Sequence, residues 1–190
     1  LKTGSKTGHL KTIRDLAGFR LADITPNFIV SMWEVFGERE AIISEGKRFT
    51  FNAMKGRVLR LANALQSLGL KPKDRCAELL YNGNEFFEAF FACSLTGCPM
   101  PFLNWHLTGE ELVDAINRAR PRVLILHDEL LDMIAPVRHR LPTIEHYVVA
   151  GTRVPEGMLS YEELIANAPE EMPETHLVVA LNPYTGGTTG

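Results

Sequence analysis

The sequence has no excess of charge of either sign. Its 190 residues include 20 lysines and arginines and 23 aspartates and glutamates, which give a formal net charge of −3. Proteins that bind nucleic acid or an anionic surface usually carry a strong basic excess. We therefore expect no nucleic-acid partner. A chain of this length is long enough for one α/β domain with a sizeable buried core.

Cysteine is scarce, and the spacing of a metal site is missing. Cys76, Cys93 and Cys98 form an odd set, and two of them lie in apolar stretches. This pattern favours reduced core thiols in a cytoplasmic protein over a disulfide or a metal site. The histidines form no i, i+4 pair and no zinc spacing with cysteine, so we expect no metal-binding residues. They are His9, His106, His127, His139, His146 and His176.

The sequence also lacks an uninterrupted apolar run long enough to cross a bilayer. The most apolar stretch, residues 86–103, contains Glu88 and is broken by Gly97, Pro99 and Pro101. We expect a buried helix and a strand there, and no integral membrane segment. Four phenylalanines at helical spacing are predicted to be core residues rather than a platform for a nucleobase. They are Phe86, Phe87, Phe90 and Phe91.

Signals for other protein classes are missing as well. No serine lies in a nucleophile elbow, so hydrolytic chemistry has no support. There is no internal repeat and no low-complexity segment, and we expect no secretory signal at the N-terminus. Residues 1–25 are expected to form a partly disordered N-terminal extension. Trp105 and His106 follow a predicted strand, where a loop and packing role is favoured over a substrate-lining one.

The sequence does contain alternating apolar strands and amphipathic helices. This alternation predicts an α/β fold with a mostly parallel sheet, flanked by helices in βαβ units. A hairpin is predicted from residues 41–44 and 48–50 around residues 45–47. Further strands are predicted at residues 75–80, 123–126, 146–149 and 177–181, and helices at residues 27–36, 51–68, 84–96, 109–119, 128–135 and 161–168.

Several helix ends carry recognisable signals. Thr50 is a predicted N-cap, and Gly69 is the predicted C′ residue of the same helix. Thr108-Gly109-Glu110-Glu111 and Ser160-Tyr161-Glu162-Glu163 each fit a capping box. The helix from residue 128 is expected to end before Pro136.

The chain ends in a loop rich in glycine and threonine, residues 184–190, after the apolar run 177–181. Glycines allow successive N–H groups to turn toward one anion, and threonine hydroxyls add donors. In open parallel sheets, ligands bind beyond the carboxyl ends of the strands. The spacing fits neither a Walker A loop nor a dinucleotide fingerprint. Local composition alone leaves a phosphate-binding loop and a flexible turn as equal alternatives.

From about Ala41 to Gly190, an ordered series of segments resembles the N-terminal part of the AMP-forming adenylating enzymes. Residues 184–190 match their phosphate-loop signature, Tyr-Thr-Ser-Gly-Thr-Thr-Gly, with Gly186 in place of Ser, a variant that fatty-acyl ligases also use. Phe51, Met54 and the segment 98–100 depart from the usual pattern. The other matching segments are residues 49–51, 60–65, 68–75, 84–86, 103–104 and 107–112, together with Gly97.

The resemblance implies an AMP-forming acyl-CoA synthetase, an acid–thiol ligase. Such an enzyme uses ATP and Mg²⁺ to convert a carboxylic acid into an acyl-adenylate, and coenzyme A then displaces AMP. Residues 26–190 would be the first part of the large N-terminal adenylating domain. The ATP phosphates would bind to Thr185, Gly186, Gly187, Thr188, Thr189 and Gly190.

The family's catalytic lysine, hinge, and adenine and ribose segments have no counterpart in these 190 residues. We therefore expect the chain by itself to be catalytically inactive, and homo-oligomers are possible through its exposed apolar surface. Two alternatives stay open. One is a non-enzymatic α/β scaffold for binding or oligomerisation. The other is an adenylation domain that loads a carrier protein.

Overall fold

The computed structural model describes residues 26–175 and 181–184. The chain divides into two compact units, Leu1–Gly56 and Arg57–Gly190. The predicted N-terminal extension, residues 1–25, lies outside the described residues. In the first unit, helix α1 (Pro26–Phe36) precedes an antiparallel hairpin of β1 (Glu40–Ser44) and β2 (Lys47–Thr50).

The hairpin turn has two residues, as its sequence allows. Glu45 and Gly46 have φ angles of 49° and 78°. Positive φ at both central residues matches the right-handed twist of the flanking strands. Helix α2 (Phe51–Ser67) follows, and the Thr50 hydroxyl accepts a 3.1 Å hydrogen bond from the N–H of Ala53. The predicted hairpin and N-cap are therefore confirmed.

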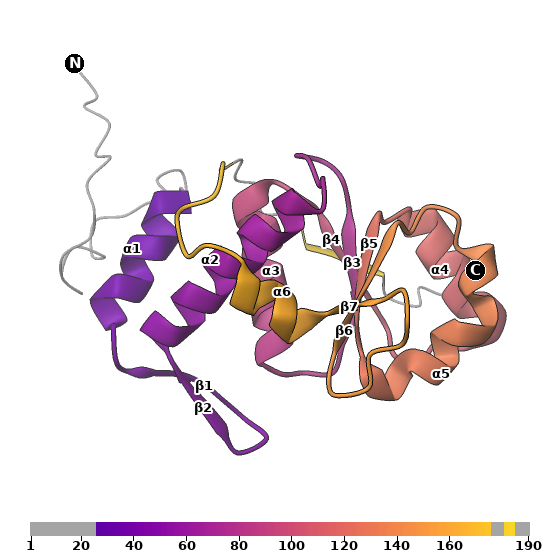
Figure 1. Cartoon of the computed structure of the whole chain (residues 1–190), viewed down its shortest axis with the longest axis horizontal. Helices are drawn as coiled ribbons and strands as arrows, with labels where there is room; N and C mark the ends of the chain where they lie inside the picture. Colours follow the sequence, from indigo (N-terminus) through magenta and orange to yellow (C-terminus); the bar gives the residue numbers. More distant parts are fainter. Residues whose placement is uncertain (1–25, 176–180, 185–190) are drawn as a thin grey trace. The chain divides into compact units, whose positions relative to one another are not determined.

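The second unit is built on a six-stranded parallel sheet in the order β7-β6-β5-β3-β4-β8. Figure 1 labels its strands β3 to β7. The predicted parallel α/β architecture is confirmed. β3 pairs with both β4 and β5, so the chain passes over β3 on its way from β4 to β5. The strands are β3 (Cys76–Leu79), β4 (Met100–Leu103), β5 (Val123–His127), β6 (His146–Ala150), β7 (Leu159–Ser160) and β8 (Leu181–Tyr184).

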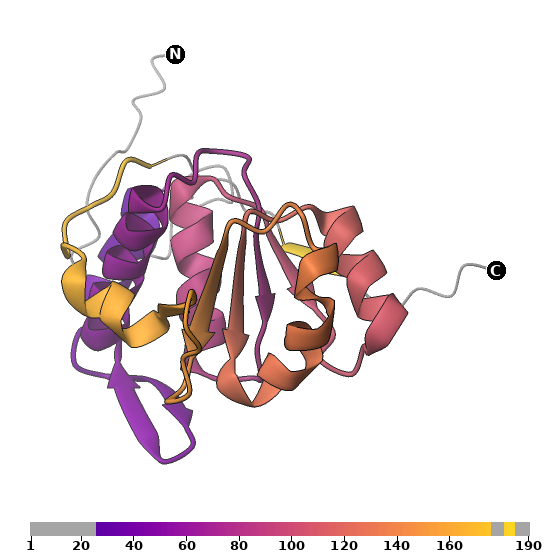
Figure 2. The ribbon, with the colours of Figure 1, turned by 45° about the vertical axis from the view of Figure 1, so that its right-hand side comes forward.

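Helices cover both faces of this sheet (Figure 2). α3 (Asn84–Thr96) and α6 (Tyr161–Asn167) lie on one face, and α4 (Gly109–Ala119) and α5 (Leu131–Ile134) on the other. The apolar side of α4 packs with α5 and the inward residues of β3, β5 and β6 in one buried cluster. β5 is buried along nearly its whole length, as a strand covered on both faces requires.

Helix α3 corrects the prediction about the phenylalanines. Its buried residues are mainly small, among them Ala89, Ala92 and Cys93. Phe87 is 44% exposed, and the other three phenylalanines are only partly buried. A sequence period of four identifies one stripe of a helix, but it does not tell which stripe faces the sheet. Small side chains let α3 approach the strands closely and leave the phenylalanines on the flanks.

Three other details differ from the predictions. Thr108 is the N-cap of α4, but its side chain makes no capping hydrogen bond. The helical segment from Asp128 continues past Pro136 as a 3₁₀ helix (Ala135–Arg140), because proline near the start of a helical turn loses no needed donor. The last described strand is Leu181–Tyr184, whereas the predicted one covers residues 177–181, of which 177–180 lie outside the described residues. The second capping box is confirmed, since Ser160 accepts from the N–H of Glu163.

A buried ionic network ties together the helices on the α3 face. The side chain of Glu88 is fully buried and accepts hydrogen bonds from Arg57 (Nε, 2.7 Å; Nη2, 3.0 Å), Asn84 (2.9 Å) and the hydroxyl of Tyr161 (2.7 Å). Arg57 also reaches Glu162 on α6, at 2.7 Å and 2.9 Å. Because four donors satisfy the carboxylate, the charge can be buried without an orphan oxygen.

Candidate functional site

The carboxyl edge of the sheet, where the parallel strands end, is the place where such folds bind ligands. β8 pairs with β4 in parallel, with Leu103 opposite Tyr184. The chain therefore leaves β8 at the carboxyl edge, beside the loop that follows β4. The six residues predicted to bind phosphate, 185–190, come next in the sequence but lie outside the described residues. Their role stays a prediction.

The loop after β4 presents aromatic side chains at this edge. Trp105 is 40% exposed, and its ring centroid lies 3.5 Å from that of His106. The side chain of Asn104 accepts a 3.0 Å hydrogen bond from the N–H of His106, which fixes a tight turn directly after the strand. Trp105 also meets Tyr81 edge-to-face, with 5.3 Å between the ring centroids.

Tyr81 and His127 join the ends of β3 and β5. Their rings are stacked with centroids 5.3 Å apart, and the N–H of Tyr81 donates a 2.9 Å hydrogen bond to Nδ1 of His127. An acceptor Nδ1 places the proton of a neutral imidazole on Nε2. Nε2 lies 3.9 Å from Oε2 of Glu85 in the first turn of α3. The ends of three neighbouring strands are thereby locked into one aromatic cluster.

The sequence only partly predicted this cluster. Trp105 and His106 lie at the expected position after a strand. The sequence alone gives no sign that Tyr81 and His127 come together, because they lie at the ends of different strands. One signal could have pointed to Tyr81, namely its place in the sequence directly after a predicted strand.

A neighbouring anion site on the carboxyl edge is already filled by the chain itself. Asp128 accepts hydrogen bonds from the N–H groups of Thr152 (2.7 Å) and Arg153 (2.8 Å), in the loop that follows β6. The backbone hydrogen bond from Arg153 is the main reason that the pKa of Asp128 is lowered. Since a carboxylate occupies this nest of amides, a ligand phosphate has no room there.

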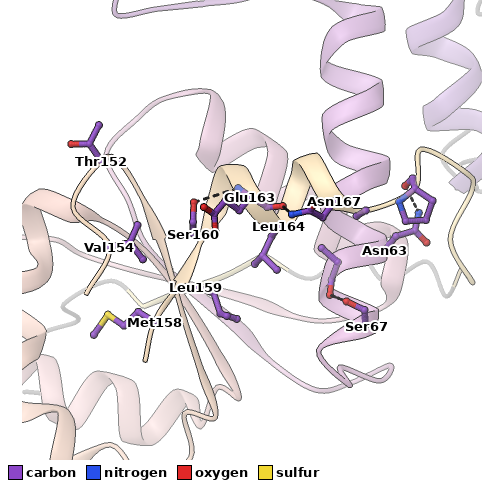
Figure 3. Close-up of a pocket in the computed structure, with 14 residues that line it drawn as sticks. Asn63, Ser67, Thr152, Val154, Met158, Leu159, Ser160, Glu163, Leu164 and Asn167 are labelled. Atoms are coloured by element: carbon purple, nitrogen blue, oxygen red, sulfur yellow. Dashed lines mark hydrogen bonds between the residues drawn. The ribbon is translucent and has the colours of Figure 1, made fainter. Parts of the chain in front are cut away.

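A hollow of about 680 Å³ lies beside β7, the strand at the other end of the strand order from β8 (Figure 3). Its lining comes from α2, the β6–β7 loop, β7 and α6, and it includes no lysine or arginine. Glu163 is its one acidic residue. A polyphosphate needs donors and positive charge, so this hollow does not suit a nucleotide.

The described residues also limit the possibilities for metals and membranes. Within residues 26–175 and 181–184, no group of three or more His, Cys, Asp or Glu side chains could hold a metal ion. The three cysteines are free and buried. No helix in the described part of the chain combines the length and the apolar character needed to cross a bilayer.

Comparison with known proteins identifies the class that this fold defines. The pattern of the AMP-binding enzyme family matches residues 31–190, so the chain belongs to that family. The resemblance to adenylating enzymes stated from the sequence is confirmed.

Several of the relatives are CoA ligases. The chain is 30% identical over 168 residues to a long-chain-fatty-acid–CoA ligase of Thermus thermophilus, which covers 86% of the chain and 31% of that protein. It is 31% identical to a medium-chain-fatty-acid–CoA ligase of Ectopseudomonas oleovorans, over 81% of the chain and 31% of that protein. A crystal structure of an anthranilate CoA ligase with anthranoyl-AMP matches 85% of the chain and 33% of its own length, with a TM-score of 0.77 and 30% identity. The chain therefore spans about a third of the length of these relatives.

Proposed function

We propose that the protein to which this chain belongs is an AMP-forming acid–thiol ligase. In the first step, a carboxylate oxygen attacks the α-phosphorus of ATP, and pyrophosphate leaves as an acyl-adenylate forms. In the second step, the thiol of coenzyme A attacks the acyl carbon, and AMP leaves. Membership of the AMP-binding enzyme family is the observation that carries this proposal.

The parallel pairing of β8 supports a role for residues 185–190 in holding the ATP phosphates. β8 points its carboxyl end to the edge where parallel sheets bind ligands. The first step brings an anionic carboxylate to a polyanionic nucleotide, so the two repel. Backbone N–H groups and the hydroxyls of Thr188 and Thr189 would offset this repulsion and fix the phosphates for in-line attack. Mg²⁺ would arrive with the triphosphate, because it is usually bound through substrate phosphates together with one or two carboxylates.

The relatives indicate a class of substrate acid and a class of acceptor. The relatives named above act on long-chain, medium-chain and aromatic acids. Gly186 favours a fatty acid, as in the fatty-acyl ligases that share this variant. Coenzyme A is the acceptor favoured by those relatives, and a carrier protein is the alternative.

The test uses the complete gene product and a panel of carboxylic acids. We expect acid-dependent ATP–pyrophosphate exchange, and we expect the double variant Thr188→Val/Thr189→Val to lose it about 100-fold or more with the fold intact. The control is Thr108→Val/Thr152→Val, because both threonines are exposed and lie on loops of the same edge. Unchanged pyrophosphate release in the first variant would refute the role of the two hydroxyls.

A second arm separates the acceptors and the scaffold alternative. Free coenzyme A and a phosphopantetheinyl carrier protein are offered in turn, and thioester formation is measured. No exchange with any acid, together with no ATP binding, would contradict the ligase and favour the non-enzymatic α/β scaffold.

A further inference from the structure

The segment that follows α6 is held by side chains of α2. This segment, residues 168–175, is called the connector below, and it has no regular secondary structure. Arg60 donates to the carbonyl oxygen of Ala168 at 2.6 Å, and Gln66 donates to that of Glu174 at 2.7 Å. Between them, Asn63 Nδ2 lies 3.0 Å from the carbonyl oxygen of Pro169 and 2.8 Å from that of Glu171.

The three donors form a ladder because of their spacing. Arg60, Asn63 and Gln66 lie three residues apart on α2 and so share one side of the helix. The connector contains two prolines, which have no N–H, and its carbonyl groups need donors from elsewhere. Figure 3 shows Asn63 at the end of the hollow where the connector begins. The ladder therefore replaces the hydrogen bonds that a regular element would make for itself.

The direction of the ladder matters for β8. Connector residues contact α2 in ascending order, from residue 168 opposite Arg60 to residue 174 opposite Gln66. The C-terminal end of α2 leads into β3, at the amino edge of the sheet. A strand parallel to β4 must also start at that edge. The ladder thus leads the chain from the β7 side of the sheet toward the edge where β8 begins.

β8 gains from such support because it is short and, in the described part of the chain, is paired on one side only. It has four residues, and within the described residues it pairs with β4 alone. Pro183 has no N–H and therefore cannot donate a backbone hydrogen bond to a neighbouring strand. A strand of four residues that lacks one backbone donor is held less firmly than a longer strand with all its donors.

We propose that Arg60, Asn63 and Gln66 are positioning residues that set β8, and through it the phosphate loop, by holding the connector. The part that concerns the loop rests on the proposed function. Removing the amide donors makes β8 detach from β4 more often and weakens ATP binding, while the remainder of the sheet stays intact.

The first experiment measures hydrogen exchange in the 190-residue chain and needs no ligand. Asn63→Asp keeps the size of the side chain but places an acceptor oxygen against the connector carbonyls. The matched control is Asn117→Asp. It removes a side-chain amide on α4 that donates a 3.2 Å hydrogen bond to the carbonyl oxygen of Arg140, on the other face of the sheet. We expect the amides of β8 to exchange about tenfold faster in Asn63→Asp and at the wild-type rate in the control.

The amides of β5 report on global stability in the same samples. Unchanged exchange in β8, or an equal increase in β5 and β8, overturns the proposal. Gln66→Glu is the second variant, and it is expected to act in the same direction as Asn63→Asp.

The second experiment measures ATP–pyrophosphate exchange in the complete gene product. We expect KM for ATP to rise about tenfold in Asn63→Asp, with KM for the acid unchanged, whereas a general loss of folded enzyme would lower kcat alone. An unchanged KM for ATP overturns the link to the phosphate loop. If the wild-type protein shows no exchange with any acid, the proposed function fails, and hydrogen exchange at β8 still decides whether the ladder positions the strand.

Discussion

A Cβ atom added to Gly151 would lie 2.2 Å from Cγ of Asp128. The two residues share a corner of the carboxyl edge, where the Asp128 carboxylate caps the amides that follow Gly151. Gly151 also has a φ of +136°, a conformation that residues with a side chain rarely adopt. Glycine is therefore required here for two independent reasons. The loop after β6 contacts the start of the helical segment after β5 through these hydrogen bonds.

Gly151→Ala is expected to destabilise the chain by about 3 kcal/mol, because the new methyl group must displace a hydrogen-bonded carboxylate. Gly157→Ala is the control, since its φ is +75° but the nearest atom to an added Cβ is 4.0 Å away. The control is expected to cost only about 1 kcal/mol. Urea unfolding measures both. Equal losses would show that the contact with Asp128 adds nothing to the backbone strain.

Glu78 gives the fold a pH dependence. It lies in the interior strand β3, is 2% exposed, and its Oε2 has no hydrogen-bond partner among the described residues. Burial raises its pKa from the usual 4.5 to about 8. Between these two values the unfolded chain has released a proton that the folded chain keeps. The free energy of unfolding therefore falls as the pH rises from about 4.5 to 8, and the loss is complete above that range.

Glu78→Gln is expected to remove this dependence. The amide is neutral at every pH, so the variant matches the wild-type stability near pH 5 and exceeds it near pH 9 by up to about 5 kcal/mol, the equivalent of the full pKa shift. Urea unfolding of both proteins at the two pH values is the measurement. Parallel pH profiles would contradict a buried, neutral Glu78.

The ion pairs of the chain differ widely in their expected contribution. Arg57→Met leaves the fully buried Glu88 without its charged partner, which is expected to cost about 3–5 kcal/mol. Arg140→Met breaks a two-pronged contact with Glu110 (2.6 Å each), but both side chains are solvent-exposed, and the expected loss is much smaller than that of Arg57→Met. Unfolding free energies compare the two variants. Adding Glu88→Gln to Arg57→Met is expected to restore part of the loss, and no recovery would argue that packing around Arg57 dominates.

The fold was predictable because most of its signals are local. The continuous apolar run of β5 indicates a strand covered on both faces, and this is what the structure has. Gly97 ends α3 with a φ of 74°, the left-handed conformation that a glycine after a helix predicts. The burial of charged residues was not predictable in this way. Glu78 and Glu88 look like ordinary polar interruptions until the neighbouring helices are in place.

The arrangement of side chains at the carboxyl edge could not be predicted, because it depends on contacts between distant parts of the chain. Tyr81 meets His127 only because β3 and β5 are neighbours, and β4 lies between them in sequence. The strand order follows from long-range pairing, which no local pattern specifies. The connector shows the same limit, since its acidic, proline-containing sequence indicates a loop but not the ladder of α2 side chains that holds it.

The hydrogen bond between Tyr81 and His127 can be tested separately from the stacking of their rings. His127→Phe keeps a flat ring beside Tyr81 but removes the Nδ1 acceptor, which leaves the Tyr81 N–H without its partner at 2.9 Å. We expect the Tyr81 amide to exchange about tenfold faster and the free energy of unfolding to fall by about 1–2 kcal/mol. His106→Phe is the control at the same edge, because His106 engages Asn104 through its backbone rather than its ring. Hydrogen exchange resolved at Tyr81 checks the difference, and an amide that exchanges alike in both variants would show that ring stacking alone joins the ends of β3 and β5.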